Sequence, residues 1–168
     1  MSDMQMATAA TPKYPTTTNR QSDREVVITR TFDAPARIVF EAWTTPELLM
    51  RWWTPESFGI TFISCEADVR TGGTYKFVMG HPSFDQPMAF HGRYLEVVPA
   101  RKIVWTNEEG EPGSVTTVTF EEKDGKTHLR LSDVHPSKAA LDAELESGAI
   151  SGYPEQFNQL DILLKSRQ

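Results

Sequence analysis

Hydrophobic and polar residues alternate in several short runs along this 168-residue chain. Alternation with a period of two is typical of a β-strand that buries one face. The pattern predicts a first strand over residues 25–32 and six later strands, over 60–69, 74–79, 88–98, 102–107, 114–122 and 126–134. Short turns join the later strands, and Asp124-Gly125 is typical of a tight hairpin. Consecutive hairpins of this kind predict an antiparallel meander.

Two short helices are expected between the first strand and the second. Asp33 and Pro35 favour the start of one, because Asp accepts hydrogen bonds from free amides and Pro costs little in a first turn. Thr45 and Pro46 form a similar helix-start signal, which predicts a second helix that reaches Trp53. The chain therefore places a helical pair directly before the meander.

The C-terminal part is predicted to be helical. A short helix over 136–145 has Ser137 as its cap, and a longer helix begins between residues 148 and 152 and ends near Lys165. Pro154 fits only the first turn of that longer helix. Apolar residues recur in it at three- and four-residue spacing, so one face must pack against the sheet: Tyr153, Phe157, Leu160, Leu163 and Leu164.

Together these elements predict an α+β fold in which a curved, seven-stranded antiparallel sheet wraps the long C-terminal helix. The first strand pairs with the last strands of the meander. A hydrophobic share of 39% is enough for one core, so residues 24–165 are expected to form a single domain. Residues 1–23 are rich in Thr, Ala, Ser and Pro, with Tyr14 as their only aromatic residue, and are expected to be a disordered tail.

Charge and cysteine content narrow the classes of partner. The net charge of −6, without any cluster of Lys or Arg, argues against nucleic acid and anionic membrane as partners. Cys65 is the only cysteine, which excludes an intramolecular disulfide and a thiolate metal cage. No apolar run approaches the roughly 18 residues of a membrane span, and no secretion signal opens the chain. A cytoplasmic location is therefore expected.

Several motifs, in this order and spacing, carry a resemblance to a known family: FDAPARIVFEAW (32–43), RWW (51–53), DVRTGGTYKF (68–77), GRYLEVVP (92–99), IVWT (103–106), and Gly152-Tyr153 followed by Phe157 and Leu160. The chain resembles the SRPBCC or START-like helix-grip superfamily, and within it the stand-alone bacterial branch called activator of heat-shock protein 90 ATPase homologue. It departs from the pattern at Tyr153, where Trp is usual, and at Pro154. The resemblance implies a START-like domain whose sheet can curve away from the C-terminal helix and leave a cavity.

The aromatic residues are the first candidates for a binding site. Neighbours on a helix point about 100° apart, so at most one of Trp52 and Trp53 faces the core, and the other faces a cavity mouth or solvent. The alternative is that both only plug the end of the domain. The candidate ligand-binding set comprises Trp43, Trp52, Trp53, Phe58, Tyr75, Phe77, Met79, His91, Arg93, Trp105, Tyr153, Phe157 and Leu160. A fully packed core is the competing interpretation for most of them.

Few polar residues form a recognisable site. His91 and Arg93 share a strand face and could orient a ligand carboxylate if that face is concave, whereas a convex face would leave them solvated. Ile63 and Cys65 lie on the strand face that is expected to be buried. Glu66 lies on the opposite face of that strand and is expected to be exposed. The four histidines lack metal-ligand spacing, so no metal site is expected. No catalytic constellation and no cofactor-binding loop is present, so no cofactor is expected.

Three functions remain open at this point. The first is a binding domain that holds an apolar or amphipathic small molecule between the sheet and the C-terminal helix. The second is a cyclase- or hydrolase-type enzyme that uses the same cavity, with His91, Arg93 or Glu66 as acid or base. The third, suggested by the family resemblance, is an interaction protein that contacts a chaperone and activates its ATPase. Either a monomer or a homodimer is compatible with the sequence.

Overall fold

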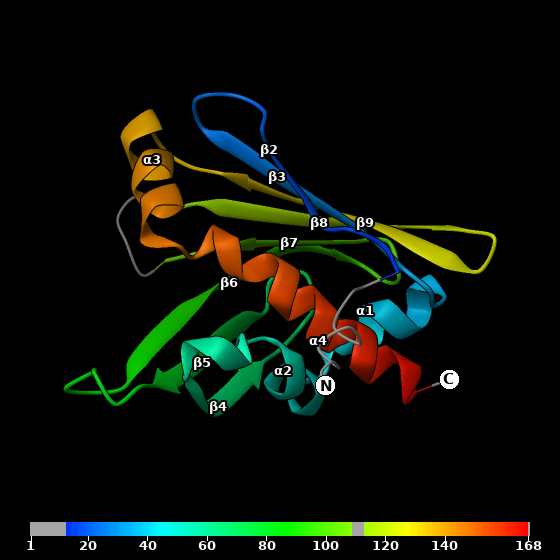
Figure 1. Cartoon of the computed structure of the whole chain (residues 1–168), viewed down its shortest axis with the longest axis horizontal. Coiled ribbons are helices and arrows are strands. Elements are labelled where there is room, and N and C mark those ends of the chain that lie inside the picture. Colours follow the sequence, from blue (N-terminus) through cyan, green and yellow to red (C-terminus); the bar gives the residue numbers. More distant parts are fainter. Residues whose placement is uncertain (1–12, 109–112, 168) are drawn as a thin grey trace, which may run out of the picture.

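The computed structural model describes residues 13–108 and 113–167. One antiparallel sheet of eight strands, in the order β2-β3-β9-β8-β7-β6-β5-β4, curves around the long C-terminal helix (Figure 1). The strands are β2 (Thr17–Arg20), β3 (Glu25–Phe32), β4 (Thr61–Ala67), β5 (Thr74–Gly80), β6 (Met88–Val98), β7 (Lys102–Thr106), β8 (Val115–Lys123) and β9 (Lys126–Val134). The helices are α1 (Ala36–Thr44), α2 (Pro46–Trp52), α3 (Lys138–Ser147) and α4 (Tyr153–Lys165), with 3₁₀ turns η2 (Glu56–Phe58) and η3 (Ile150–Gly152).

The α+β fold agrees with the prediction, but the sheet has eight strands and not seven. The additional strand, β2, lies inside the segment that was expected to be a disordered tail. It pairs with β3 from Thr17 opposite Thr29 to Arg20 opposite Val26, and all four of its residues are exposed. An edge strand whose residues are all exposed buries no side chain, so it leaves no hydrophobic pattern to detect. The rest of that predicted tail, residues 1–12, lies outside the described residues.

The predicted pairing of the first strand with the end of the meander is confirmed. Strand β3 pairs with β9 over its whole length, from Glu25 opposite Val134 to Phe32 opposite Thr127. The hairpin between β8 and β9 turns through Asp124 and Gly125, whose φ angles are 55° and 76°. Positive φ at both central residues defines the turn that matches the twist of paired strands, so this hairpin forms as expected.

Strand β4 contains an irregularity that the sequence did not predict. Its register against β5 shifts between Phe62 and Ser64, so the alternation of side chains changes there. Phe62 packs on Phe77 with ring centroids 5.3 Å apart, whereas Ile63 is 50% exposed. The expectation that Ile63 faces the core was therefore wrong, because a bulge moves every residue beyond it to the other face.

The C-terminal helix α4 crosses the inner face of the sheet, which is the face that the helices cover (Figure 1). Pro154 occupies its first turn and leaves the helix continuous to Lys165. Phe157 and Leu160 are fully buried, and Phe157 meets Phe32 of β3 edge to face at 5.6 Å. Among the helices within residues 13–108 and 113–167, none combines the length and apolarity needed to cross a membrane.

Candidate ligand-binding site

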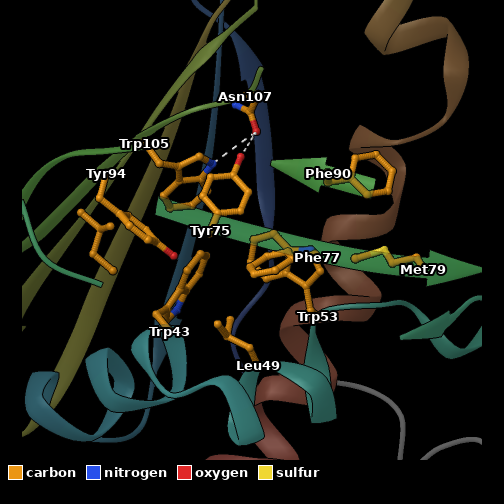
Figure 2. Close-up of a pocket in the computed structure, with 11 residues that line it drawn as sticks. Trp43, Leu49, Trp53, Tyr75, Phe77, Met79, Phe90, Tyr94, Trp105 and Asn107 are labelled. Atoms are coloured by element: carbon orange, nitrogen blue, oxygen red, sulfur yellow. Dashed lines mark hydrogen bonds between the residues drawn. The ribbon is translucent and has the colours of Figure 1, made fainter. Parts of the chain in front are cut away.

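An apolar cavity of about 160 Å³ lies between the inner face of strands β5 to β7 and the helical pair α1 and α2 (Figure 2). Aromatic rings make up most of its wall. The lining residues are Trp43, Leu49, Trp53, Tyr75, Phe77, Met79, Phe90, Tyr94, Ile103, Trp105 and Asn107. No residue of α4 is among them, so the cavity is not bounded by the C-terminal helix as the sequence suggested.

Strand alternation and one glycine position the sheet side of this cavity. Tyr75, Phe77 and Met79 occupy alternate positions of β5, and all three are buried on the inner face. The ring of Tyr75 lies over Gly92 of β6, where an added Cβ would come within 2.8 Å of Tyr75 Cε2 and 1.9 Å of the Thr106 carbonyl oxygen. Only glycine allows this close approach, which fixes Tyr75 against its neighbouring strand.

The helical side of the cavity is a cluster of tryptophans centred on Trp43. The ring of Trp43 lies 4.8 Å from that of Trp52, 5.8 Å from that of Trp53 and 6.1 Å from that of Trp105. Trp52 is fully buried, and its indole nitrogen donates to the Ala42 carbonyl at 2.9 Å, which ties α2 to α1. Trp53, just after α2, turns the other way and lines the cavity. Trp52 therefore belongs to the core and Trp53 to the cavity wall, an assignment that the sequence left open.

Helix α4 holds Trp53 in place from behind. The side-chain amide of Gln159 donates to the carbonyl oxygens of Trp52 at 3.1 Å and Thr54 at 2.9 Å, and that of Gln156 donates to the Trp53 carbonyl. The Gln159 side-chain oxygen also accepts from the Glu56 amide at 2.8 Å. These bonds satisfy carbonyl groups that the end of α2 leaves without helical partners. α4 thus shapes the cavity without lining it.

Polar groups gather at the Asn107 end of the cavity, as Figure 2 shows. The Trp105 indole donates to Asn107 Oδ1 at 3.3 Å, and Asn107 Nδ2 donates to Thr116 Oγ1 at 3.0 Å. Because an indole N–H can only donate, the orientation of the Asn107 amide follows from this contact. The Tyr75 hydroxyl donates to the Thr106 carbonyl at 2.7 Å. Most of the hydrogen-bonding groups of the wall therefore lie at one end of the cavity, and the rest of the wall is mainly apolar.

Tyr94 adds one further polar group to the wall. Its hydroxyl points inward, toward Trp43 (Figure 2). Removal from water raises the pKa of Tyr94 far above its ordinary value of 10. The phenol therefore stays neutral at physiological pH and can donate a hydrogen bond. The Trp43 indole nitrogen is also buried and has no hydrogen-bond partner among the described residues.

A second, polar cavity of about 370 Å³ lies beyond Trp53 and Trp105, between strands β8 and β9 and helix α3. Asp133 and His135 are both more than nine-tenths buried in its wall. Thr116 donates its hydroxyl hydrogen to Asp133. Burial raises the pKa of Asp133 to about 6, and the Thr116 hydrogen bond and the charge of His135 oppose that shift only in part.

The sequence contained a signal for this second cavity. Leu129 and Leu131 of β9 alternate into the core, and the same alternation puts Asp133 and His135 on the inner face. Polar residues in a row of buried positions are unusual unless they are bonded or functional. Asp133 was not among the residues predicted from the sequence, and His135 was counted only as one of four scattered histidines.

The predicted ligand-binding residues lie in several different parts of the structure. Those that line the apolar cavity are Trp43, Trp53, Tyr75, Phe77, Met79 and Trp105. Trp52, Phe157 and Leu160 belong to the packed core, Tyr153 lines the polar cavity, and Phe58 is 38% exposed above Gly152. The cavity residues that the prediction missed are Leu49, Phe90, Tyr94, Ile103 and Asn107.

His91 and Arg93 lie outside both cavities. Gly92 and Tyr94 take the inner face of β6, so His91 and Arg93, which alternate with them, point outward and are exposed. Arg93 there donates from Nε to Glu108 at 2.7 Å. Glu66 of β4 is exposed as well. An enzyme that uses these three side chains as acid or base in the cavity is excluded by their positions.

Neither a metal cluster nor an activated thiol is evident. Within residues 13–108 and 113–167, no group of three or more His, Cys, Asp or Glu side chains could hold a metal ion. Burial raises the pKa of the Cys65 thiol to about 11, and the nearby carboxylates Glu47 and Glu66 add to that shift. Its thiolate is therefore scarce at neutral pH.

The comparison with protein families gives the same result as the fold. A model described as Activator of Hsp90 ATPase homolog 1-like protein matches residues 33–165. The chain belongs to this family. The Hsp90 ATPase activator homolog 1-like family shares the helix-grip architecture described above. No curated protein matches the chain significantly.

Solved structures with the same helix-grip fold come from several bacteria. Protein Ms6760 from Mycobacterium smegmatis is 27% identical, with a TM-score of 0.77 over 92% of this chain and 100% of that chain. A protein from Rhodobacter sphaeroides is 20% identical, with a TM-score of 0.83 over 91% and 99%. Protein NE0264 from Nitrosomonas europaea is 23% identical, with a TM-score of 0.79 over 88% and 98%. The last two similarities concern the fold alone.

Proposed function

We propose that this protein binds a small apolar or amphipathic molecule in the apolar cavity between strands β5 to β7 and helices α1 and α2. The observation that carries the proposal is an aromatic-lined space of about 160 Å³ whose polar groups are confined to a few points. Binding pockets in proteins are mostly apolar, with a small number of polar groups that orient the ligand. Membership of a helix-grip family, whose members typically bind ligands, supports the same function.

The volume limits the size of the ligand. An engineered cavity of about 150 Å³ in another protein stays dry and binds benzene, whereas drug-sized ligands occupy pockets of about 300 to 1,000 Å³. The cavity described above therefore suits a single ring or a short chain. A hydroxyl or carbonyl on that ring would meet Asn107 or the Tyr94 phenol at the wall.

Titration with 2-phenylethanol tests the proposal. This neutral probe has one ring and one hydroxyl, so we expect saturable binding of one molecule per chain, measured by isothermal titration calorimetry and by ligand-observed NMR. Replacing Met79 with Trp fills the cavity from β5 and should weaken binding at least about tenfold, since a bulky group then occupies the ligand's volume.

The matched control is Met50→Trp. Met50 lies on α2 but is 37% exposed and outside the cavity, so the same substitution there should leave the affinity unchanged. Circular dichroism and thermal melts establish that both variants are folded. Absence of saturable binding to the natural chain, or equal affinity of folded Met79→Trp, would contradict the proposal.

A further inference from the structure

The apolar and the polar cavity adjoin each other. Trp53, Trp105 and Asn107 line both of them. A chain of hydrogen bonds also crosses the boundary, because Asn107 Nδ2 donates to Thr116 Oγ1 and the Thr116 hydroxyl donates to Asp133. The polar cavity is the larger of the two, at about 370 Å³ against about 160 Å³. These three side chains therefore lie between the two cavities, and Asn107 and Thr116 connect the wall of the apolar cavity to Asp133.

The lining of the polar cavity is acidic. Asp133 of β9 and Glu144 of α3 both contribute to its wall, and neither Lys nor Arg is present among its described lining residues. Repulsion from Glu144 contributes to the raised pKa of Asp133, so the two carboxyl groups act on each other across the cavity. A cationic group entering this space would be attracted by both, whereas an anion would be repelled.

Asp133 has capacity for another partner. Among the described residues, the Asp133 side chain accepts one hydrogen bond, which comes from the Thr116 hydroxyl. An ionised carboxylate can accept about four hydrogen bonds. His135, beside it, has a buried Nε2 without any partner in the described structure. Buried polar groups left unsatisfied in this way destabilise a fold unless something binds them. Here His135 Nε2 is such a group, and its residue lines the same cavity as Asp133.

Aromatic rings complete the wall around the carboxylates. Trp53 and Trp105 lie at the boundary with the apolar cavity, and Tyr153 of α4 lines the polar side. Cations bind favourably over the faces of such rings, and Trp is the strongest partner. Carboxylates combined with aromatic faces form an environment suited to an organic ammonium group.

We infer that the two cavities form one site for an amphipathic amine, whose apolar ring occupies the apolar cavity and whose protonated nitrogen binds Asp133. This inference rests on the proposed function, since it requires the apolar cavity to hold the ring. Glu144 contributes charge at longer range, and the rings of Trp53, Trp105 and Tyr153 surround the ammonium group.

Three probes of similar shape and different charge test the inference on the full chain at pH 7.5. They are 2-phenylethylamine, which is cationic, 2-phenylethanol, which is neutral, and 3-phenylpropanoate, which is anionic. Calorimetry should give the amine an affinity at least about tenfold higher than that of the alcohol, because hydrogen bonds to charged groups are the stronger ones. The propanoate should bind most weakly of the three.

Two substitutions test which carboxyl group is responsible for the preference for the amine. Asp133→Asn keeps an oxygen for the Thr116 hydroxyl but removes the charge, so affinity for the amine should fall to that for the alcohol while the alcohol is bound as before. Glu144→Gln, at a half-buried position, should reduce the amine affinity about twofold to fivefold. The matched control is Glu146→Gln, an exposed residue on the same helix outside the cavity, which should change neither affinity.

Failure of the inference and failure of the proposed function give different results. Equal affinity for amine and alcohol in the natural chain, tighter binding of the propanoate, or an amine preference that persists in folded Asp133→Asn overturns the inference alone. If no probe binds the natural chain, the apolar site itself is absent and both proposals fall. The comparison of probes in the natural chain decides the question even if Asp133→Asn fails to fold.

Discussion

At the inner face of β9, Asp133 follows two buried leucines, Leu129 and Leu131, in the same row of side chains. Its carboxyl group is removed from water, which raises its pKa from the ordinary 3.8 to about 6. The titratable groups that face it are His135, Glu144 of α3 and Tyr153 of α4. The ionised form of Asp133 destabilises the fold, and groups with such shifted pKa values cluster at functional sites.

The Asp133 carboxyl group should make stability depend on pH in a defined direction. Because its pKa is higher in the folded chain, the folded state binds the proton more tightly, and stability is lost as the pH rises through about 6. Asp133→Asn has no such proton, so its free energy of unfolding relative to the natural chain should increase by about 1 to 2 kcal/mol from pH 5 to pH 8. Urea denaturation at the two pH values measures this difference.

Asp142 provides a control that should not respond between pH 5 and pH 8. It lies on the surface of α3, where hydrogen bonds from Lys138 and Arg20 lower its pKa. A lowered pKa means that the charged form stabilises the folded state, and this contribution is complete above the ordinary pKa of 3.8, so the stability of Asp142→Asn relative to the natural chain should not change between pH 5 and pH 8. A pH dependence of the same sign for both variants would show that the effect of Asp133→Asn does not come from its own burial.

At the scale of elements, the connection between α2 and α4 matters most for the site. Trp53 faces the cavity because the chain leaves α2 at that point, and Gln159 holds the following turn through the carbonyl groups of Trp52 and Thr54. Hydrogen bonds from a distant helix thus fix a side chain that lines the apolar cavity. Neither helix shows this contact in its own pattern of apolar residues.

Gln159→Ala should therefore weaken both the fold and the site. Loss of the three hydrogen bonds to Trp52, Thr54 and Glu56 should lower the free energy of unfolding by about 3 kcal/mol, at roughly 1 kcal/mol for each bond. Affinity for 2-phenylethanol should also fall several-fold, because Trp53 is less firmly held. Chemical denaturation and calorimetry measure the two effects.

Lys165→Ala is the matched control, since Lys165 is exposed near the end of the same helix. It should change stability by less than about 0.5 kcal/mol and leave binding unchanged. If Gln159→Ala behaved in the same way as this control, the hydrogen bonds to the turn after α2 would have no part in positioning Trp53.

For the whole molecule, the apolar cavity and the hydrophobic core are parts of one structure. Trp43 packs on Phe157 of α4 at 6.3 Å and also lines the apolar cavity, so the core continues into the cavity wall. A cavity within a core leaves its lining atoms without contacts on one side. Occupation by a ligand restores those contacts and should stabilise the entire domain.

We therefore expect ligand binding to raise the melting temperature. At a concentration one hundred times its Kd, a ligand that binds only the folded state adds about 2.7 kcal/mol. For a domain of this length the melting temperature should rise by roughly 5 to 10 °C. Thermal melts with 2-phenylethanol test this, and Met79→Trp should show no such rise, because its cavity is filled. An equal rise in that variant would indicate binding elsewhere.

The sequence by itself determined the order of elements and the inward faces of most strands. Periods of two and of about 3.6 residues are set by local backbone geometry, so β6 and β9 have the bounds that the pattern predicted. The same alternation identified Tyr75, Phe77 and Trp105 as inward residues, and all three line the cavity. Correctly read, it would also have identified Asp133.

Only the tertiary structure shows which elements pack against the inward faces of the strands. A cavity is the volume that packing leaves unfilled, so no local pattern shows that α1 and α2, and not α4, close it. Nor could the sequence assign Trp52 to the core and Trp53 to the cavity, because that depends on hydrogen bonds from α4. The eighth strand, β2, is exposed throughout and joins the sheet only through pairing with β3. Residues far apart in the chain meet through such packing, and this is why the site became visible only in the folded structure.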